Sequence, residues 1–471
     1  MLIAVTGASG HVGNNLVRAL VEAGHQVRAL VHRDREPLEG LPVEIVQIDV
    51  LDLASLERAF QGVEVVFHLA AHISLMESGP EALRLNAANV QGTKNTVAAA
   101  LSCQVRRLVH VSSIEALLHP DKPSPIDETP VDPQGLPTLY GRSKALGNQE
   151  ILAGIARGLD AVIVFPTAVV GPNDFKPSMF GQMFLDFGQG RLPALTPGGF
   201  DLVDVRDVVQ GLLSALHKGR NGEGYLLSGR YVSVAEIASV LEQATGARRP
   251  WLVVPFWLML LAATFTPLFY RLSQKRPRFT RMTVHMLGDG RTISREKALH
   301  ELGYSPRDPT EGIRAALLWL QETGRLPREQ SIYGSKVDRM IAFPLAAATL
   351  VSLLGGIQFL TESGGPRLGL GALAIALPLL FLWLTIPTRY LLCAGELHVR
   401  AGPFRWRIPT DSIVEVTRSR NPFSAPAWSF DRLKITYLCF GKKSTLLISP
   451  QPREPFLSRL REQSPSARIQ G

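Results

Sequence analysis

The sequence predicts an α/β fold with a doubly wound parallel sheet over residues 1–330, then a membrane-spanning helical hairpin and a small, mostly β domain. Three observations predict this organisation. Short aliphatic runs alternate with amphipathic helical stretches over the first two thirds of the chain, which is typical of βαβ units. Two long uncharged runs follow. The remaining residues contain short strand-like segments and one helical segment.

Size, charge and cysteine content limit the possible classes. The 471 residues, 46% of them hydrophobic, suffice for two or three domains. The net charge of +9 is concentrated in residues 387–471, which contain 14 Lys or Arg and 6 Asp or Glu. Such a segment attracts anionic surfaces, either lipid or nucleic acid. Cys103, Cys393 and Cys439 form no disulfide or metal-binding pattern, so we expect no metal site and a reducing compartment.

Six strand-like runs define the expected parallel sheet. They cover residues 2–7, 26–32, 43–49, 63–70, 106–113 and 160–171. Amphipathic stretches such as residues 14–24 and 85–103 lie between them. Aliphatic strands that alternate with helices indicate a parallel sheet with helices on both faces. Because the first run starts at residue 2, no signal peptide is expected.

The stretch "TGASGHVG" follows the first expected strand and precedes the first expected helix. It places Gly7, Gly10 and Gly13 in the spacing GxxGxxG. Glycines here allow a sharp turn and a close approach of the backbone to a pyrophosphate, while the helix N-terminus offers N–H donors to that anion. We therefore expect a dinucleotide-binding loop. The loop also contributes Ser9, His11 and Val12.

The end of the second strand predicts which nicotinamide cofactor binds. An acidic residue there would bind the ribose 2′-hydroxyl of NAD, whereas a basic residue suits the 2′-phosphate of NADP. The sequence has His32 and Arg33 at this point and Asp34 only after them, which favours NADP; the alternative is that Arg33 is a solvated loop residue. The other residues expected to contact the cofactor follow later strands: Asp49, Val50, Leu69, Ala70, Ala71 and Pro166.

The stretch "YGRSK" places Tyr140 and Lys144 four residues apart, so they share one face of a helix. Hydride exchange at an oxygen-bearing carbon needs a proton donor or acceptor beside it, and tyrosine needs a nearby cation to lower its pKa for this role. We expect Lys144 to lower the pKa of Tyr140 and to hold the nicotinamide ribose. A serine at the end of the strand at 106–113, Ser112 or Ser113, would orient the substrate oxygen.

These motifs resemble the extended short-chain dehydrogenase/reductase superfamily. The matching segments occur in that family's order: "TGASGHVG", "DVLD", "FHLAA", "NVQGT", "VSSIEAL", "YGRSK", "PTAVVGPND" and "DVRDV". The resemblance covers about residues 1–325 and is strongest to the 3β-hydroxysteroid dehydrogenase and dihydroflavonol reductase branch. It implies a Rossmann fold with a small substrate lobe, mainly residues 171–330. It also implies the catalytic set Ser113, Tyr140 and Lys144, of which the last two contact the cofactor as well.

Residues 340–360 and 368–386 are uncharged runs joined by "TESGGPR". Each is roughly 30 Å long as a helix, which matches the thickness of a hydrocarbon core. Basic residues flank the pair on both sides and only Arg367 lies in its turn, so both flanking domains are expected on the cytoplasmic side of the inner membrane. Residues 251–270 are also uncharged and precede a basic segment. We expect an interfacial helix there, with a third span or a buried helix as alternatives.

Residues 388–465 form the expected C-terminal domain, and residues 466–471 a polar tail. Strand-like segments cover residues 389–395, 396–402, 412–419, 432–438 and 444–450, and a helical segment covers residues 453–463. This part resembles the bacterial pleckstrin-homology-like domains of the YyaB type. Its arginines lack the interleaved aromatic residues of a nucleic-acid platform, so no nucleic acid partner is expected.

The sequence thus predicts a membrane-anchored NAD(P)-dependent oxidoreductase that interconverts a hydroxyl and a ketone on a lipophilic substrate of sterol, hopanoid or isoprenoid type. The lipid bilayer is an expected partner, and a homodimer is possible. One alternative is a nucleotide-sugar epimerase or dehydratase; Phe165 argues against it, because sugar-modifying relatives often carry arginine there. Another alternative is a nucleotide-responsive membrane scaffold.

Overall fold

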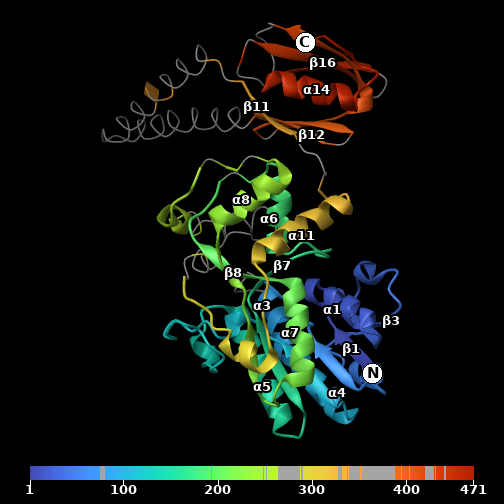
Figure 1. Ribbon diagram of the computed structural model, residues 1–471, viewed down its shortest axis with the longest axis vertical. Helices are drawn as coiled ribbons and strands as arrows, with labels where there is room; N and C mark the ends of the chain where they lie inside the picture. Colours follow the sequence, from blue (N-terminus) through green and yellow to red (C-terminus); the bar gives the residue numbers. More distant parts are fainter. Residues whose placement is uncertain are drawn as a thin grey trace, which may run out of the picture. The chain divides into compact units, whose positions relative to one another are not determined.

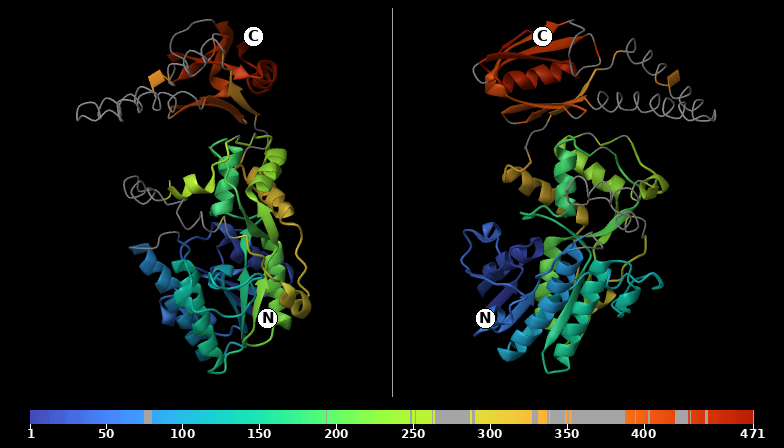
Figure 2. Two further views of the ribbon diagram at one scale, coloured as in Figure 1. Left: turned by 90° about the vertical axis from the view of Figure 1, so that its left-hand side faces the viewer. Right: turned by 180° about the vertical axis from the view of Figure 1, so that it is seen from behind.

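A computed structural model of the chain contains two compact units (Figure 1, Figure 2). The first unit comprises residues 1–187, 191–244 and 249–325; the C-terminal unit comprises residues 326–471 with the short segments 188–190 and 245–248. The structure describes residues 1–74, 80–192, 194–247, 249–250, 252–261, 263, 287, 290–326, 331–336, 338, 349, 351–352, 388–393, 395–402, 404–419, 429, 431–439 and 442–470.

The first unit is built on a seven-stranded sheet in which each strand runs parallel to its neighbours. The strand order is β3-β2-β1-β4-β5-β6-β9. The strands are β1 (Leu2–Thr6), β2 (Gln26–Val31), β3 (Glu44–Gln47), β4 (Val65–His68), β5 (Arg107–Val111), β6 (Ala161–Pro166) and β9 (Gly224–Leu227). Every residue of β4 and β6 is buried, as expected for strands covered on both faces. The predicted parallel sheet is confirmed.

Helices cover both faces of this sheet. One face carries α1 (His11–Glu22) and α7 (Val205–Lys218), and the other carries α2 (Leu53–Phe60), α4 (Gly92–Ser102) and α5 (Leu139–Ile155). The other helical segments of the unit are α3 (Pro80–Asn86), α6 (Met179–Gly188), α8 (Val234–Thr245), α11 (Pro309–Glu322), the 3-10 turns η1 (Glu36–Leu38), η3 (Ile114–Ala116) and η4 (Pro133–Gly135), and the π-helical turns η2 (Ala87–Gln91) and η5 (Ala298–Leu302).

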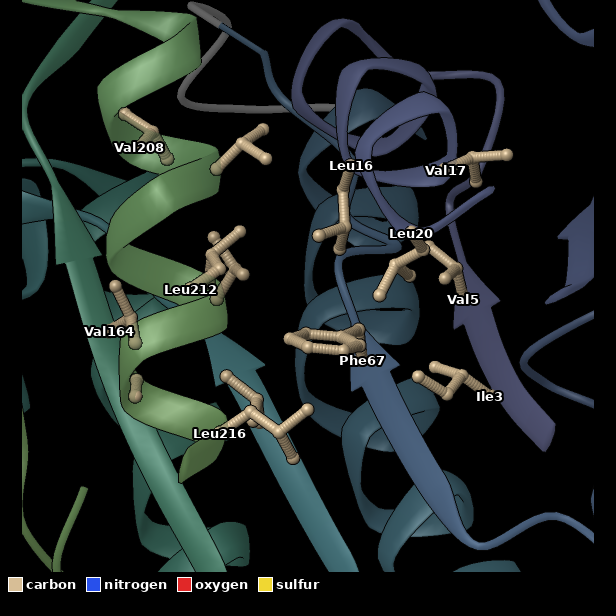
Figure 3. Packing of buried hydrophobic residues seen from close by; sticks show 14 of the residues in the cluster. Ile3, Val5, Leu16, Val17, Leu20, Phe67, Val164, Val208, Leu212 and Leu216 are labelled. Carbon is tan, nitrogen blue, oxygen red and sulfur yellow. The ribbon is translucent and has the colours of Figure 1, made fainter. Parts of the chain in front are cut away.

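Two hydrophobic clusters hold these layers together. In the first, Leu16 of α1 and Leu212 of α7 pack over the sheet beside Phe67 of β4 (Figure 3). Alternate residues of a strand point to opposite faces. Accordingly, Ile3 belongs to the first cluster and Ala4 to the second.

The first unit also contains a smaller sheet, whose strands β7 and β8 are labelled in Figure 1. It has the order β10-β8-β7, with β7 (Ala168–Val170) parallel to β8 (Gly199–Asp204) and β10 (Arg230–Ser233) antiparallel to it. The prediction of one strand over residues 160–171 is therefore wrong. The run divides at Thr167, because its first half pairs with β5 and β9 and its second half pairs with β8.

In the C-terminal unit the described residues include two antiparallel sheets, with one short parallel pair at an edge, and helix α14 (Arg453–Gln463). One sheet has the order β14-β13-β12-β11-β18 and the other β17-β16-β15-β19. The elements are β11 (Ser331–Ser335), β12 (Thr388–Cys393), β13 (Glu396–Ala401), β14 (Phe404–Pro409), η6 (Thr410–Ser412), β15 (Ile413–Ser419), β16 (Arg432–Cys439), β17 (Lys442–Ile448), β18 (Pro450–Gln451) and β19 (Arg468–Ile469). Phe456 and Leu460 of α14 are fully buried against both sheets.

The predicted membrane hairpin falls almost wholly outside the described residues: of residues 340–360 only 349, 351 and 352 are described, and of residues 368–386 none is. Among the residues that the structure does describe, no helix combines the length and the apolar character needed to cross a bilayer. Of the predicted interfacial segment, residues 252–261 and 263 are described. Residues 256–261 are helical, with Met259 buried and Trp257 67% exposed.

Candidate active site

The loop after β1 makes a narrow turn at the N-terminus of α1. Gly7 has a φ of +66°, and a Cβ on it would lie 2.8 Å from the backbone nitrogen of Ala70. A Cβ on Gly13 would collide with the carbonyl oxygen of Gly7. Both positions require glycine, because backbone packs against backbone here. Helix α1 begins after Gly10 without a side-chain cap, so its N-terminal N–H groups can serve an anion. This cradle fits the pyrophosphate of a dinucleotide.

Asparagines hold the start of α1 against the loop that follows β7. Asn14 Nδ2 donates to the carbonyl oxygens of Gly10 at 2.8 Å and Asn173 at 3.0 Å. Asn15 Nδ2 donates to the carbonyl oxygen of Pro172 at 3.1 Å, and His11 Nε2 lies 3.0 Å from the same oxygen. The "PTAVVGPND" segment therefore supports the glycine loop. Neither asparagine of α1 was predicted, although both are polar residues on the buried side of a helix.

The predicted site residues meet at one edge of the sheet. In a parallel sheet the loops after neighbouring strands lie side by side, and β2, β1, β4 and β5 are neighbours in this order. This brings together the loop after β2, the glycine loop, the segment Leu69–Ala71 and Ser113. The backbone nitrogens of Leu69 and Ala70 both donate to Thr6 Oγ1 at 3.2 Å, which joins the ends of β4 and β1. Ser9 and Val12 lie within the glycine loop and α1, and Pro166 ends β6.

The loops after β2 and β3 carry the residues predicted to bind the adenosine half. His32 and Arg33 are exposed just beyond β2. The carboxylate of Asp34 forms an ion pair with Lys176 Nζ at 3.0 Å. Asp49 Oδ1 accepts a hydrogen bond from Leu51 N at 2.9 Å and so closes its own turn. Val50 lies against α4: its carbonyl oxygen accepts from Asn95 Nδ2 at 3.0 Å.

Ser113, Tyr140 and Lys144 are brought together from β5 and α5. Ser113 follows the last residues of β5, and its hydroxyl lies close enough to Tyr140 to lower the pKa of the tyrosine. Lys144, one helical turn after Tyr140, is buried and its Nζ donates to the carbonyl oxygen of Val111 at 2.7 Å. Ser112 points elsewhere: its Oγ is buried and has no hydrogen-bond partner among the described residues. The geometry therefore favours Ser113 over Ser112.

The ionisation of this group differs from the prediction in one respect. Burial lowers the pKa of Lys144 to about 8. Burial raises the pKa of Tyr140, the charge of Glu115 raises it further, and the nearby hydroxyl of Ser113 lowers it. The expectation that Lys144 lowers the pKa of Tyr140 is therefore not met in the protein alone. The physical reason is that burial destabilises the phenolate, and the ammonium of Lys144, which donates to Val111, does not offset this cost.

Asn89 connects the loop after β4 to helix α5. Its Nδ2 donates to the carbonyl oxygen of His72 at 2.9 Å and to Ser143 Oγ at 2.9 Å, and its Oδ1 accepts from His72 N at 2.8 Å. Ser143 Oγ in turn donates to the carbonyl oxygen of Tyr140 at 2.8 Å. Asn89 lies in the π-helical turn η2, a feature frequent at functional sites. Asn89 is the first residue of the "NVQGT" motif, but no role was predicted for it.

Two stacked histidines lie beneath Lys144. The rings of His68 and His110, paired across β4 and β5, have centroids 5.3 Å apart. His68 is hydrogen-bonded to Thr6 Oγ1 at 2.8 Å and Thr93 Oγ1 at 3.2 Å. Burial and then the charge of Lys144 lower the pKa of His68 to about 3. Both effects also hold His110 neutral, so this part of the site floor is uncharged.

The geometry can be set beside known proteins. Residues 3–228 match the NAD dependent epimerase/dehydratase family, and residues 388–464 match the bacterial PH domain. The chain is 38% identical over 330 residues to "Sterol demethylase protein B" of Methylococcus capsulatus, covering 69% of this chain and 100% of that protein. It is 28% identical over 332 residues to a "3 beta-hydroxysteroid dehydrogenase/Delta 5-->4-isomerase" of Mycobacterium tuberculosis, covering 66% and 87%.

A solved structure agrees with these relatives. The crystal structure of gox2253 superposes with a TM-score of 0.60 at 35% sequence identity, covering 69% of this chain and 99% of that one. The agreement extends over the part of the chain that holds the parallel sheet and the site at its edge.

Proposed function

The chain belongs to the NAD dependent epimerase/dehydratase family and is an NAD(P)-dependent dehydrogenase or reductase of the extended short-chain type acting on CH–OH or keto groups, and we propose that its substrate is a lipophilic alcohol or ketone of sterol, hopanoid or isoprenoid type. The observation that carries the proposal is the placement of Ser113, Tyr140 and the buried Lys144 at the sheet edge that also holds the glycine loop. The sterol and steroid names of the two relatives support the substrate class.

The residues of the site transfer the proton to or from the substrate oxygen and orient that oxygen. When bound, the nicotinamide cofactor exchanges hydride with the substrate carbon. In ketone reduction Tyr140 donates its hydroxyl proton to the oxygen that becomes the alcohol; in oxidation its phenolate accepts that proton. Ser113 bonds the same oxygen and keeps it in line with Tyr140. Lys144, one helical turn after Tyr140, would hold the nicotinamide ribose when the cofactor is bound.

Cofactor preference is part of the proposal, and NADP is favoured. Arg33 is exposed where a 2′-phosphate would lie, and the one acid of this loop, Asp34, is already paired with Lys176. A carboxylate that is paired with a lysine repels a phosphate less than an unpaired carboxylate does. Arg33 can donate two hydrogen bonds to the 2′-phosphate.

Arg33→Ala is expected to weaken NADPH binding about tenfold or more and to leave NADH binding unchanged, because a hydrogen bond to a charged group contributes about 1.5–3 kcal/mol. Titration of the intrinsic fluorescence with each cofactor measures both dissociation constants. Arg58→Ala, an exposed arginine of α2, is the matched control. An equal loss for both cofactors, or none, would reject the preference for NADP.

A membrane anchor inside the C-terminal unit is also proposed. The strands β11 and β12 pair directly, with Gly334 opposite Arg389, although the two apolar runs separate them in sequence. The two ends of the segment that contains both apolar runs therefore lie at neighbouring points of one sheet, which supports an even number of crossings. Exposed Trp257 and Leu261 support contact of the first unit with a lipid surface. We infer that both units face the cytoplasm.

Two other functions account for less of the structure. Nucleotide-sugar epimerases often carry arginine near the end of β6, but Phe165 there is only 4% exposed and packs in the core. A non-catalytic scaffold gives no reason to bury the ammonium of Lys144, which costs free energy.

The test is turnover of lipid extracts by the full-length protein in membranes, with NADPH and NADH compared. The proposal expects cofactor-dependent loss of a ketone or an alcohol from the lipid fraction. Turnover of a nucleotide sugar alone would replace it with the epimerase alternative.

A further inference from the structure

Glu115 lies between the two elements that carry the catalytic residues. Glu115 belongs to η3 (Ile114–Ala116), which begins directly after Ser113. Its Oε2 accepts a hydrogen bond from Thr138 Oγ1 at 3.0 Å, and Thr138 Oγ1 caps α5 by accepting from Gly141 N at 2.6 Å. Tyr140 lies between these two residues of α5. One carboxylate therefore links the serine segment to the first turn of the tyrosine helix.

The backbone of Glu115 strengthens this link. A Cβ on Gly141 would lie 2.6 Å from the carbonyl oxygen of Glu115, so α5 and η3 touch through their main chains. The backbone N–H of Glu115 donates to Ser113 Oγ at 3.3 Å. The same residue thus contacts Ser113 at one end and the cap of α5 at the other.

The charge of Glu115 acts on Tyr140. After burial, it is the second cause of the raised pKa of the tyrosine. Burial raises the pKa of Glu115 itself to about 6, against a hydrogen bond from Thr138 that lowers it. The two cations on the same stretch of α5 are directed elsewhere: Arg142 Nε donates to the carbonyl oxygen of Leu136 and Lys144 Nζ to that of Val111. Among the described residues neither forms an ion pair with Glu115.

Resting on the oxidoreductase function proposed above, we propose that Glu115 is a positioning residue that holds Ser113 against Tyr140 and, when ionised, keeps the tyrosine hydroxyl protonated. A protonated tyrosine is the reactive form for ketone reduction, and the phenolate is the reactive form for alcohol oxidation. The ionised carboxylate therefore supports reduction near neutral pH and restrains oxidation. Below the pH at which Glu115 takes up a proton, this restraint disappears.

The test compares kcat/KM for alcohol oxidation across pH in the wild type and in Glu115→Gln. Both proteins carry a neutral side chain at position 115 below about pH 5, so the ratio of variant to wild type should be constant there. Above about pH 7 the wild type alone carries the charge. The ratio should then be larger by about tenfold, because a nearby like charge raises a pKa by about one unit. A purely structural role would give a ratio that does not depend on pH, and that result would overturn the proposal.

Two further variants separate charge from structure. Glu150→Gln removes a carboxylate from a later turn of the same helix and should leave the pH profile unchanged. Thr138→Ser retains the hydroxyl and should match the wild type, whereas Thr138→Val removes the hydrogen bond that lowers the pKa of Glu115. When both the wild type and Glu115→Gln also carry Thr138→Val, the pH at which the ratio of their kcat/KM values changes should therefore be higher. An unchanged pH would show that the Thr138–Glu115 bond does not set it.

A second readout does not depend on turnover. In full-length protein labelled with [¹³Cζ]tyrosine, the Tyr140 resonance is assigned by its absence in Tyr140→Phe and followed through an alkaline titration. Glu115→Gln should titrate Tyr140 at lower pH than the wild type. An equal pKa in both proteins would overturn the proposal. If the wild type turns over no alcohol or ketone, the proposed function fails while this titration still decides the role of Glu115.

Discussion

Tyr140→Phe is expected to lower kcat for alcohol–ketone interconversion by about 10³-fold. The substitution removes only the hydroxyl, which lies near Ser113 and is the proposed proton donor of the reaction. A positioned general acid or base contributes about 10²–10⁴ to the rate, and the raised pKa of Tyr140 leaves it protonated and ready to donate in reduction. Steady-state kinetics at saturating cofactor measure the loss.

The fold and the cofactor site should remain intact in this variant. The ring stays in place on α5, so the dissociation constant of NADPH and the thermal unfolding midpoint should change little. Tyr231→Phe serves as the control, since Tyr231 is 46% exposed on β10. Retention of more than about a tenth of the activity by Tyr140→Phe would show that another group transfers the proton.

Gly13→Ala is expected to weaken cofactor binding by about a hundredfold or more. A Cβ at this position would collide with the carbonyl oxygen of Gly7, so the glycine loop or α1 must move. Displaced N–H groups lose hydrogen bonds to the charged pyrophosphate, each contributing about 1.5–3 kcal/mol. The overpacked turn should also lower the free energy of unfolding by about 1–3 kcal/mol. Fluorescence titration and denaturant unfolding measure the two effects.

The matched control is Gly290→Ala, because a Cβ at Gly290 meets no atom of the described residues within 4 Å. It should leave both quantities near the wild-type values. Wild-type affinity in Gly13→Ala would mean that the loop after β1 does not receive the pyrophosphate.

Local sequence patterns predicted much of the site. The glycine loop, the Tyr140–Lys144 spacing and the serine after β5 are short motifs whose chemistry is encoded within a few residues. Parallel topology then brings them to one edge, because neighbouring strands end side by side. Aliphatic runs predicted the strands of the parallel sheet. The exception is the run at 160–171, because its two halves pair in two different sheets.

What the sequence did not predict depends on long-range contacts. The Glu115–Thr138 bond spans 23 residues, and the Asn89–Ser143 bond spans 54. The direction of the Tyr140 pKa depends on burial, which a motif does not contain. Strand β11 was missed because Ser331–Ser335 includes Gly334 and is separated from its partner β12 by the two apolar runs. Pairing of that kind follows from the fold of the whole unit.

Net hydride transfer to a lipophilic carbonyl at the Tyr140 site can be followed by deuterium transfer. Full-length protein in membranes is supplied with NADPH deuterated at the nicotinamide C4 and with a ketone-containing lipid fraction, in parallel with nucleotide sugars. With the wild type, deuterium is expected on the carbinol carbon of a lipid product. With Tyr140→Phe, no deuterium is expected in any lipid. Inversion of a nucleotide sugar without net cofactor consumption, and no label in any lipid, would contradict the expectation for the wild type.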